Sequence, residues 1–156
     1  YFLMLTEHFY EVKAQWNEGL KGVLSSRYLD QTIACATPPE FAKGVPNLWS
    51  PEHLYAAAIS SCFMTTFLAI AENSKLEFTD FSGNTQCKLE FVEGKYLITE
   101  AIVKPVVHLP HPERDAEKAN KVLDKTKAAC LITNSMKTTV VLDKKVVSDQ
   151  EELIAQ

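Results

Sequence analysis

The sequence has 156 residues with 16 basic and 20 acidic side chains, a formal net charge of -4, and this length fits one domain with a sizeable core. Hydrophobic residues make up 46% of the chain and charged residues 23%, which is the composition of a globular protein and argues against wholesale disorder. The mild acidity and the presence of only two arginines, Arg27 and Arg114, argue against a nucleic-acid-binding protein, which needs a clustered basic surface.

The first third of the chain indicates a strand meander followed by a loop. Residues 8–17 alternate loosely and are rich in aromatic and β-branched types, so we predict a strand that ends in a turn at 18–19. Residues 20–28 and 31–36 predict two further strands. Residues 37–49 contain three prolines and a glycine and therefore predict a loop.

Residues 51–73 predict a long helix. Ser50 is a favourable N-cap, Pro51 suits the first helical position, and Glu52 complements the positive end of the helix dipole. The helix is apolar on nearly every side, and its uncharged run over 54–71 is close to the length of a membrane span. We favour a helix buried in protein, without a membrane, because small polar side chains interrupt the run. These side chains are Ser60, Ser61, Cys62, Thr65 and Thr66.

The second half of the chain predicts a hairpin and an amphipathic helix. Strands over 84–92 and 95–107 are joined at 93–94, where Glu-Gly is a hairpin signal. His111 and Pro112 open a helix that we expect to continue to residue 129. Its apolar positions keep the spacing of one buried face. These positions are Ala119, Val122, Leu123, Thr126 and Cys130.

A short helical segment near 132–137 and a last strand over 138–147 complete the predicted elements. This order is typical of an α+β protein with helices packed on one face of a sheet. We predict a single domain over 1–156, with residues 1–7 and 148–156 peripheral to it. One small sheet covers only one side of the long helix, so we infer a homodimer in which a second copy covers the other side.

The four cysteines do not form a metal-finger pattern or a secreted disulfide framework, because they are sparse and no two of them are spaced as CxxC. Cys35 and Cys87 fall in predicted strands, where a free cysteine is expected to pack as a small hydrophobic residue. Cys62 lies in the middle of the long helix. Cys130 ends the amphipathic helix on its buried face.

No metal or organic cofactor is predicted. His108 and His111 are three residues apart, but Pro110 lies between them and disfavours a helical ligand pair. Neither a glycine-rich phosphate loop nor a nucleophile elbow occurs. The apolar start of the chain has no basic residues before it, so we expect no secretory leader and a cytoplasmic location.

Two segments of the sequence resemble the signature of the OsmC/Ohr family, the osmotically induced and organic hydroperoxide resistance proteins. In WSPEHLYAAAISSCFMTTFLAIAE, a helix opens with Pro51 and Glu52 and carries Cys62 ten residues after the glutamate. In KTKAACLITNSMK, Cys130 follows an alanine-rich turn and precedes a Ser/Asn pair. The stretch WNEGLKGVLSS is similar to the first hairpin of the family, so the resemblance extends over 8–147.

The resemblance implies an OsmC-like α+β fold, in which antiparallel sheets wrap around central long helices in an intertwined homodimer. It also implies a peroxidase of the oxidative stress response that reduces organic hydroperoxides with no bound cofactor. By motif position, Cys62 is expected to be the peroxidatic cysteine, Cys130 the resolving cysteine and Glu52 the carboxylate of the site. The thiolate becomes a sulfenic acid and then a disulfide, which an external thiol or dithiol reduces.

The sequence departs from the family at one position of the site. Family peroxidases pair the glutamate with an arginine from the first hairpin or from the loop before the long helix, and neither segment holds one here. Lys21, Lys43 and Arg27 are the nearest candidate cations. A lysine is a single charge and does not reproduce the bidentate pairing of arginine with Glu52.

Three hypotheses follow from these residues. The first is the peroxidase. The second is a thiol protein that senses oxidants or binds a small apolar ligand without efficient turnover. The third is a structural dimer whose cysteines only pack, and it predicts that Cys62 and Cys130 lie far apart. Ten residues of helix rise about 15 Å, so Glu52 and Cys62 can serve one site only from different subunits of an antiparallel helix pair.

Overall fold

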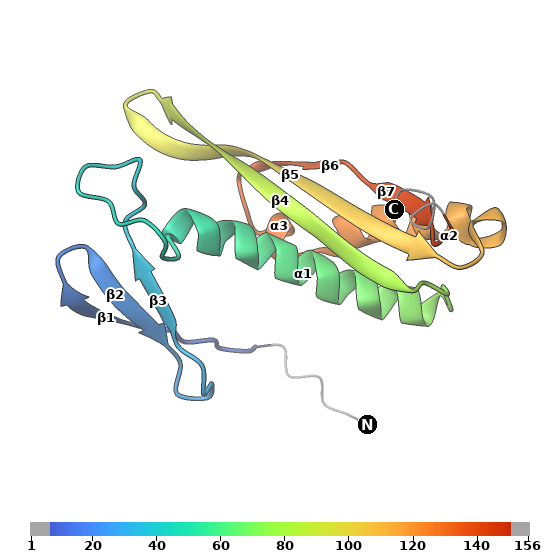
Figure 1. The fold of residues 1–156 in the computed structure, drawn as a ribbon, viewed down its shortest axis with the longest axis horizontal. Coiled ribbons are helices and arrows are strands. Elements are labelled where there is room, and N and C mark those ends of the chain that lie inside the picture. The colour runs from blue at the N-terminus through green and yellow to red at the C-terminus, as the bar shows by residue number, and fades with distance from the viewer. Residues whose placement is uncertain (1–6, 151–156) are drawn as a thin grey trace. The chain divides into compact units, whose positions relative to one another are not determined.

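The computed structural model describes residues 7–150, and its contacts group them into two compact units, one ending at Leu54 and the other starting at Tyr55 (Figure 1). Each unit is described by itself. The long helix contributes its first turn to the N-terminal unit and the rest to the C-terminal unit. The single domain stays a prediction, and most of the predicted terminal segments lie outside the described residues.

The N-terminal unit is a three-stranded antiparallel meander, as predicted. Its strands are β1 (Lys13–Glu18), β2 (Lys21–Ser25) and β3 (Ile33–Ala36), in the order β1-β2-β3. The predicted start of the first strand at residue 8 is wrong. Lys13 pairs with Ser25, the last residue of β2, so the residues before Lys13 have no strand opposite them.

The loop predicted over 37–49 is confirmed, and backbone contacts hold it against the meander. The Ala36 amide donates to the Trp49 carbonyl at 2.8 Å, and the Val45 amide donates to the Thr37 carbonyl at 2.8 Å. Gly44 passes so close to Pro38 that a Cβ at this position would lie 2.0 Å from the proline carbonyl oxygen. Only glycine fits this approach.

Helix α1 (Pro51–Asn73) has the predicted bounds. The Ser50 hydroxyl caps it by accepting a hydrogen bond from the His53 amide at 3.2 Å. Its buried residues are spaced one turn apart: Ile59, Phe63, Phe67 and Ala71. Within one chain the opposite face is exposed, with Met64 at 41% and Leu68 at 42%, so a single chain does not surround the helix as expected. By length and composition α1 is also a candidate membrane span.

The C-terminal unit is built on a long hairpin of β4 (Asp80–Val92) and β5 (Lys95–Leu109). Glu93 and Gly94 both have positive φ, 49° and 80°, which is the turn geometry that favours this pair in a hairpin. The predicted last strand is two strands, β6 (Thr139–Leu142) and β7 (Lys145–Ser148). Both pair with β5 in parallel along the same edge, so this sheet is mixed.

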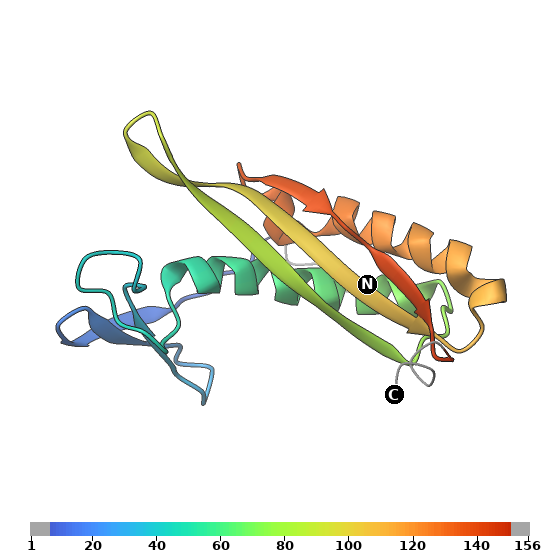
Figure 2. The same ribbon diagram turned by 45° about the horizontal axis from the view of Figure 1, so that its top comes forward.

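Helices α2 (Pro112–Ala129) and α3 (Leu131–Asn134) follow the hairpin, and Figures 1 and 2 show α1 and α2 on the same side of the sheet. On β5 every second residue from Ala101 to Leu109 is buried, so one face of the strand meets the helices. The predicted buried face of α2 is confirmed, since each of its five positions is at most 2% exposed. Phe67 of α1 stacks on Phe81 of β4 with ring centroids 4.5 Å apart.

Leu123 of α2 is fully buried in this core, so we expect Leu123→Ala to lower the free energy of unfolding by about 2–5 kcal/mol. Leu29, which is 66% exposed in the turn after β2, is the matched control, and Leu29→Ala should change it by less than about 0.5 kcal/mol. Urea unfolding at one fixed protein concentration measures both. Equal effects of the two substitutions would contradict the described core.

Candidate active site

The structure places Cys62 and Cys130 on different elements of the C-terminal unit. Cys62 lies in the middle of α1 and is half-buried. Cys130 is fully buried at the junction of α2 and α3, where it is the C-cap of one helix and the N-cap of the next. Its extended backbone, with φ -64° and ψ 107°, breaks the helical path between them.

Hydrogen bonds fix the short turn that follows Cys130. The Cys130 carbonyl accepts the Asn134 amide at 3.0 Å and the Thr133 hydroxyl at 3.2 Å. The Asn134 side-chain amide donates to the Ala128 carbonyl at 3.0 Å, which ties the turn back to the end of α2. The segment that carries Cys130 is therefore held on both sides of the cysteine.

The two predicted redox cysteines are brought together. The thiol of Cys130 hydrogen-bonds to the Cys62 sulfur, and both cysteines are free thiols. This contact does not agree with the hypothesis of a purely structural dimer, which requires the two residues to lie far apart.

The surroundings of Cys62 shift its acidity in opposite directions. Burial raises the pKa of the thiol, but hydrogen bonds to the sulfur outweigh burial, and the pKa lies below its ordinary value. The Ile132 amide is the first of these donors, followed by the Cys130 thiol, the Thr66 hydroxyl and the Leu131 amide. The site therefore favours the thiolate, which is the reactive form of cysteine.

A hydrogen-bonded chain links α1 to the strand segment beyond Cys130. The Thr138 hydroxyl donates to the Ile98 carbonyl at 2.9 Å, and it lies 2.6 Å from the Tyr55 hydroxyl. Because the single proton of Thr138 is used on Ile98, Tyr55 is the donor in the second bond. The chain holds the segment after α3 against the helix that carries Cys62.

Glu52 lies in the first turn of α1 and belongs to the N-terminal unit. One of its carboxylate oxygens, Oε2, is buried and has no hydrogen-bond partner among residues 7–150. A buried carboxylate oxygen without a partner is costly, so a donor or a cation from outside this chain would stabilise it. A site shared by Glu52 and the cysteines stays a prediction.

Two of the three predicted cations, Arg27 and Lys21, contact other side chains, and the third, Lys43, lies in the loop before α1. Arg27 hydrogen-bonds to the Tyr28 hydroxyl and lies over the ring, with its guanidinium carbon 4.6 Å from the centroid. Lys21 lies 3.5 Å from a Glu18 oxygen. Lys43 occupies a left-handed position in the loop before α1, with φ 61°. The second arginine, Arg114, is bound by Asp115 at 2.6 Å and by Glu77 at 2.7 Å.

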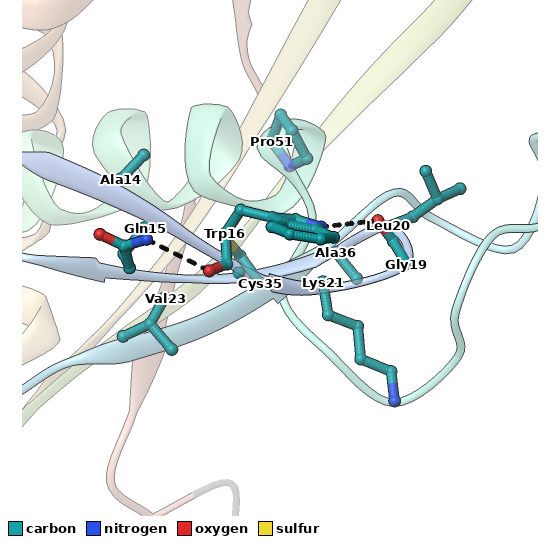
Figure 3. A pocket seen from close by; sticks show the side chains of 11 residues that line it. Ala14, Gln15, Trp16, Gly19, Leu20, Lys21, Val23, Cys35, Ala36 and Pro51 are labelled. Carbon is teal, nitrogen blue, oxygen red and sulfur yellow. Dashed lines mark hydrogen bonds between the residues drawn. The ribbon is translucent and has the colours of Figure 1, made fainter.

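The N-terminal unit contains a cavity of about 490 Å³ that was not predicted (Figure 3). It is lined by Trp16, Lys21 and Cys35 of the meander and by Pro51 of α1. The Trp16 indole lies along the hairpin and donates to the Gly19 carbonyl at 3.0 Å (Figure 3). The open setting leaves Cys35 half-buried, outside the packed core where we expected it.

Cys87 agrees with the packing role expected for it. It is half-buried on β4 and packs against the core, and burial raises the pKa of its thiol. In the described part of the chain, no group of three or more His, Cys, Asp or Glu side chains is placed to hold a metal ion.

Several groups around Cys62 were not predicted as parts of the site. Thr66 could have been identified, because residues four apart on a helix lie on the same face. The amides of Leu131 and Ile132 leave no mark in the sequence, since every residue except proline carries one. The same holds for the pairing of Tyr55 with Thr138, which are 83 residues apart.

The α+β fold and the thiol pair together indicate a class of two-cysteine proteins. In this class one thiol lies on a long helix and a second, buried thiol lies beside it. The family model for OsmC-like proteins matches residues 44–145 of this sequence. The chain therefore belongs to the OsmC-like family. The predicted family and the predicted OsmC-like α+β fold are confirmed, and the homodimer stays a prediction.

The relatives agree with this assignment. The YmaD protein of Bacillus subtilis is 27% identical over 143 residues, which cover 89% of this chain and 93% of that protein. An OsmC-like protein of Vibrio cholerae has the same fold, with a TM-score of 0.75 and 21% identity over 89% of this chain and 100% of that one. An organic hydroperoxide resistance protein, OsmC, from Legionella pneumophila gives a TM-score of 0.69 and 19% identity over 90% of this chain and 98% of that one.

The opposite pKa shifts of two half-buried cysteines predict selective chemistry. At pH 7 we expect iodoacetamide to alkylate Cys62 at least about ten times faster than Cys87, because the Cys62 pKa is lowered and the Cys87 pKa is raised. Peptide mass spectrometry after timed quenching measures the two rates. The urea-unfolded protein is the control, in which both cysteines should react alike. Equal rates in the folded protein would contradict the described site.

Proposed function

We propose that this protein is a thiol peroxidase that reduces organic hydroperoxides as part of oxidative stress defence. The observation that carries the proposal is the contact between the half-buried Cys62 and the fully buried Cys130. Membership of the OsmC-like family and the fold shared with an organic hydroperoxide resistance protein support it. The cycle would run in the cytoplasm, where cysteines are kept reduced.

The proposed cycle needs only thiols and the peroxide. The Cys62 thiolate attacks the O–O bond, a sulfur–oxygen bond forms, and the alcohol leaves after taking up a proton. Cys62 is oxidised to the sulfenic acid while the hydroperoxide is reduced. The Cys130 sulfur then attacks the sulfenic sulfur, a disulfide forms and water leaves. An external thiol or dithiol reduces the disulfide by exchange and is itself oxidised.

The substrate class follows from the apolar side chain next to Cys130. Leu131 is 69% exposed, and its backbone amide donates to the Cys62 sulfur. This apolar surface favours the organic part of an alkyl or aryl hydroperoxide through burial. Hydrogen peroxide has no apolar part and gains nothing from it.

We also propose that the working form is a homodimer that pairs through α1. The exposed face of the helix carries apolar and small polar side chains: Ser61, Met64, Thr65 and Leu68. In an antiparallel pair, Glu52 of one subunit could approach Cys62 of the other, which the rise of about 15 Å prevents within one helix. Lys21, Lys43 and Arg27 remain the candidate cations for the unpartnered Glu52 oxygen.

The peroxidase proposal predicts consumption of cumene hydroperoxide by the pure protein with excess dithiol. Cys62→Ser should abolish turnover, because serine cannot form the sulfenic acid. Cys130→Ser should keep one fast oxidation of Cys62 but lose efficient cycling through the internal disulfide. A Glu52→Gln variant in the same assay tests the carboxylate, whose loss should lower turnover.

Cys35→Ser is the matched control in this assay, since Cys35 belongs to the N-terminal cavity and should leave turnover unchanged. Turnover that persists in Cys62→Ser would disprove the proposal.

The engaged arginines favour a second candidate function, a thiol protein that senses oxidants or binds a small apolar ligand without efficient turnover. Arg27 and Arg114 both have partners, so the described residues offer no free arginine to polarise a peroxide. This function predicts that a Cys62–Cys130 disulfide forms under oxidant although the wild type shows no sustained peroxide consumption. The same assay, with the disulfide detected by mass spectrometry, separates the two functions.

The dimer proposal predicts that a charge on the exposed face of α1 separates the subunits. Leu68→Glu would bury a carboxylate against the partner helix, so the measured mass should fall from that of two chains to that of one. Light scattering coupled to size-exclusion chromatography measures the mass. Lys125→Glu on the exposed face of α2 is the control and should leave the mass unchanged. A wild-type protein of one-chain mass would contradict the dimer.

A further inference from the structure

We propose that Thr66 is a further catalytic residue, whose hydroxyl donates a hydrogen bond to the reacting sulfur of Cys62 and holds it as a thiolate where family peroxidases use an arginine. This inference rests on the proposed function in one respect: it takes Cys62 as the reacting group.

The geometry places the Thr66 hydroxyl beside the sulfur. Thr66 follows Cys62 by four residues, one turn along α1, so both side chains lie on the same face of the helix. The Thr66 Oγ1 and Cys62 Sγ atoms are 3.9 Å apart. A thiolate has no proton to give, so in the reactive state of the site Thr66 is the donor.

The neighbouring threonine explains why the Thr66 hydroxyl is available. A threonine in a helix commonly donates to the carbonyl three or four residues earlier, as Thr126 does to Val122 at 2.7 Å. The Cys62 carbonyl, which Thr66 could use in this way, accepts the Thr65 hydroxyl at 3.2 Å instead. Among residues 7–150 the Thr66 hydroxyl has no hydrogen-bond partner other than the Cys62 sulfur.

The other donors to the sulfur come from a different part of the chain. The amides of Leu131 and Ile132 and the thiol of Cys130 belong to the junction of α2 and α3. Thr66 adds a donor from the helix that carries Cys62 itself. Because hydrogen bonds to an ionised acceptor are stronger than those between neutral groups, these donors together can stabilise a thiolate without a cation.

The donors also differ in their part in the reaction. Cys130 attacks the oxidised Cys62 and is itself bonded in the disulfide, so it is a reactant as well as a donor. Thr66 is a half-buried side chain on a regular helix and takes no covalent part in the cycle. It therefore acts only on the acidity of Cys62, together with the amides of Leu131 and Ile132.

The experiment is the pH dependence of Cys62 alkylation in Thr66→Val, which keeps the branched shape and removes the hydroxyl. The pH at which the alkylation rate of Cys62 is half-maximal, called the midpoint here, should rise by roughly one pH unit. Alkylation at pH 7 should slow by roughly three- to tenfold. Thr66→Ser should restore most of the wild-type midpoint. Thr126→Val on α2 is the matched control: it removes a helical hydroxyl that donates to the Val122 carbonyl, and it should leave the midpoint unchanged.

Either of two results would overturn the inference: a wild-type midpoint in Thr66→Val, or an equal shift in Thr126→Val. Thr66→Ala is measured in parallel, with thermal unfolding of each variant, so that a misfolded valine variant does not decide the outcome. Alkylation requires no peroxide, so it tests Thr66 even if the wild type shows no turnover. In that case the proposed function is disproved, and the alkylation midpoints of the variants still decide the inference about Thr66.

Discussion

The arrangement of the C-terminal unit depends on one burial constraint, the packing of the apolar side of α1 against one face of β5. Ile59, Phe63 and Phe67 occupy that side, and α2 completes the core beside them. Because the same packing fixes the rotation of α1, Cys62 is presented to the end of α2, where Cys130 begins the next turn. The chemistry of the thiol pair thus follows from the way an apolar helix is covered.

The site that results has an unusual balance of forces for a reactive thiol. Burial opposes ionisation of Cys62, and only hydrogen-bond donors in the described structure counter it. The amides of Leu131 and Ile132 among these donors are fixed by backbone geometry, whereas a lysine or arginine side chain must be held in place at an entropic cost.

The sequence predicted much of this fold because its signals are local. The bounds of α1 and α2, the turn at 93–94 and the buried face of α2 follow from caps, glycine and periodicity. Errors arose where a distant partner decides the outcome: β1 begins late because β2 ends at Ser25, and the last strand is divided into β6 and β7. The cysteines were identified from their motifs, but the amides and Thr66 beside them depend on tertiary contact.

The parallel pairing of β6 and β7 with β5 has a consequence for biosynthesis. These strands are among the last described parts of the chain, and Thr138, just before β6, connects to Tyr55 across 83 residues. Contacts of such long range form late in folding. On the ribosome, Cys62 emerges well before the segment that brings Cys130 to it. A nascent chain therefore carries two separate thiols until the segment after Cys130 has emerged and folded.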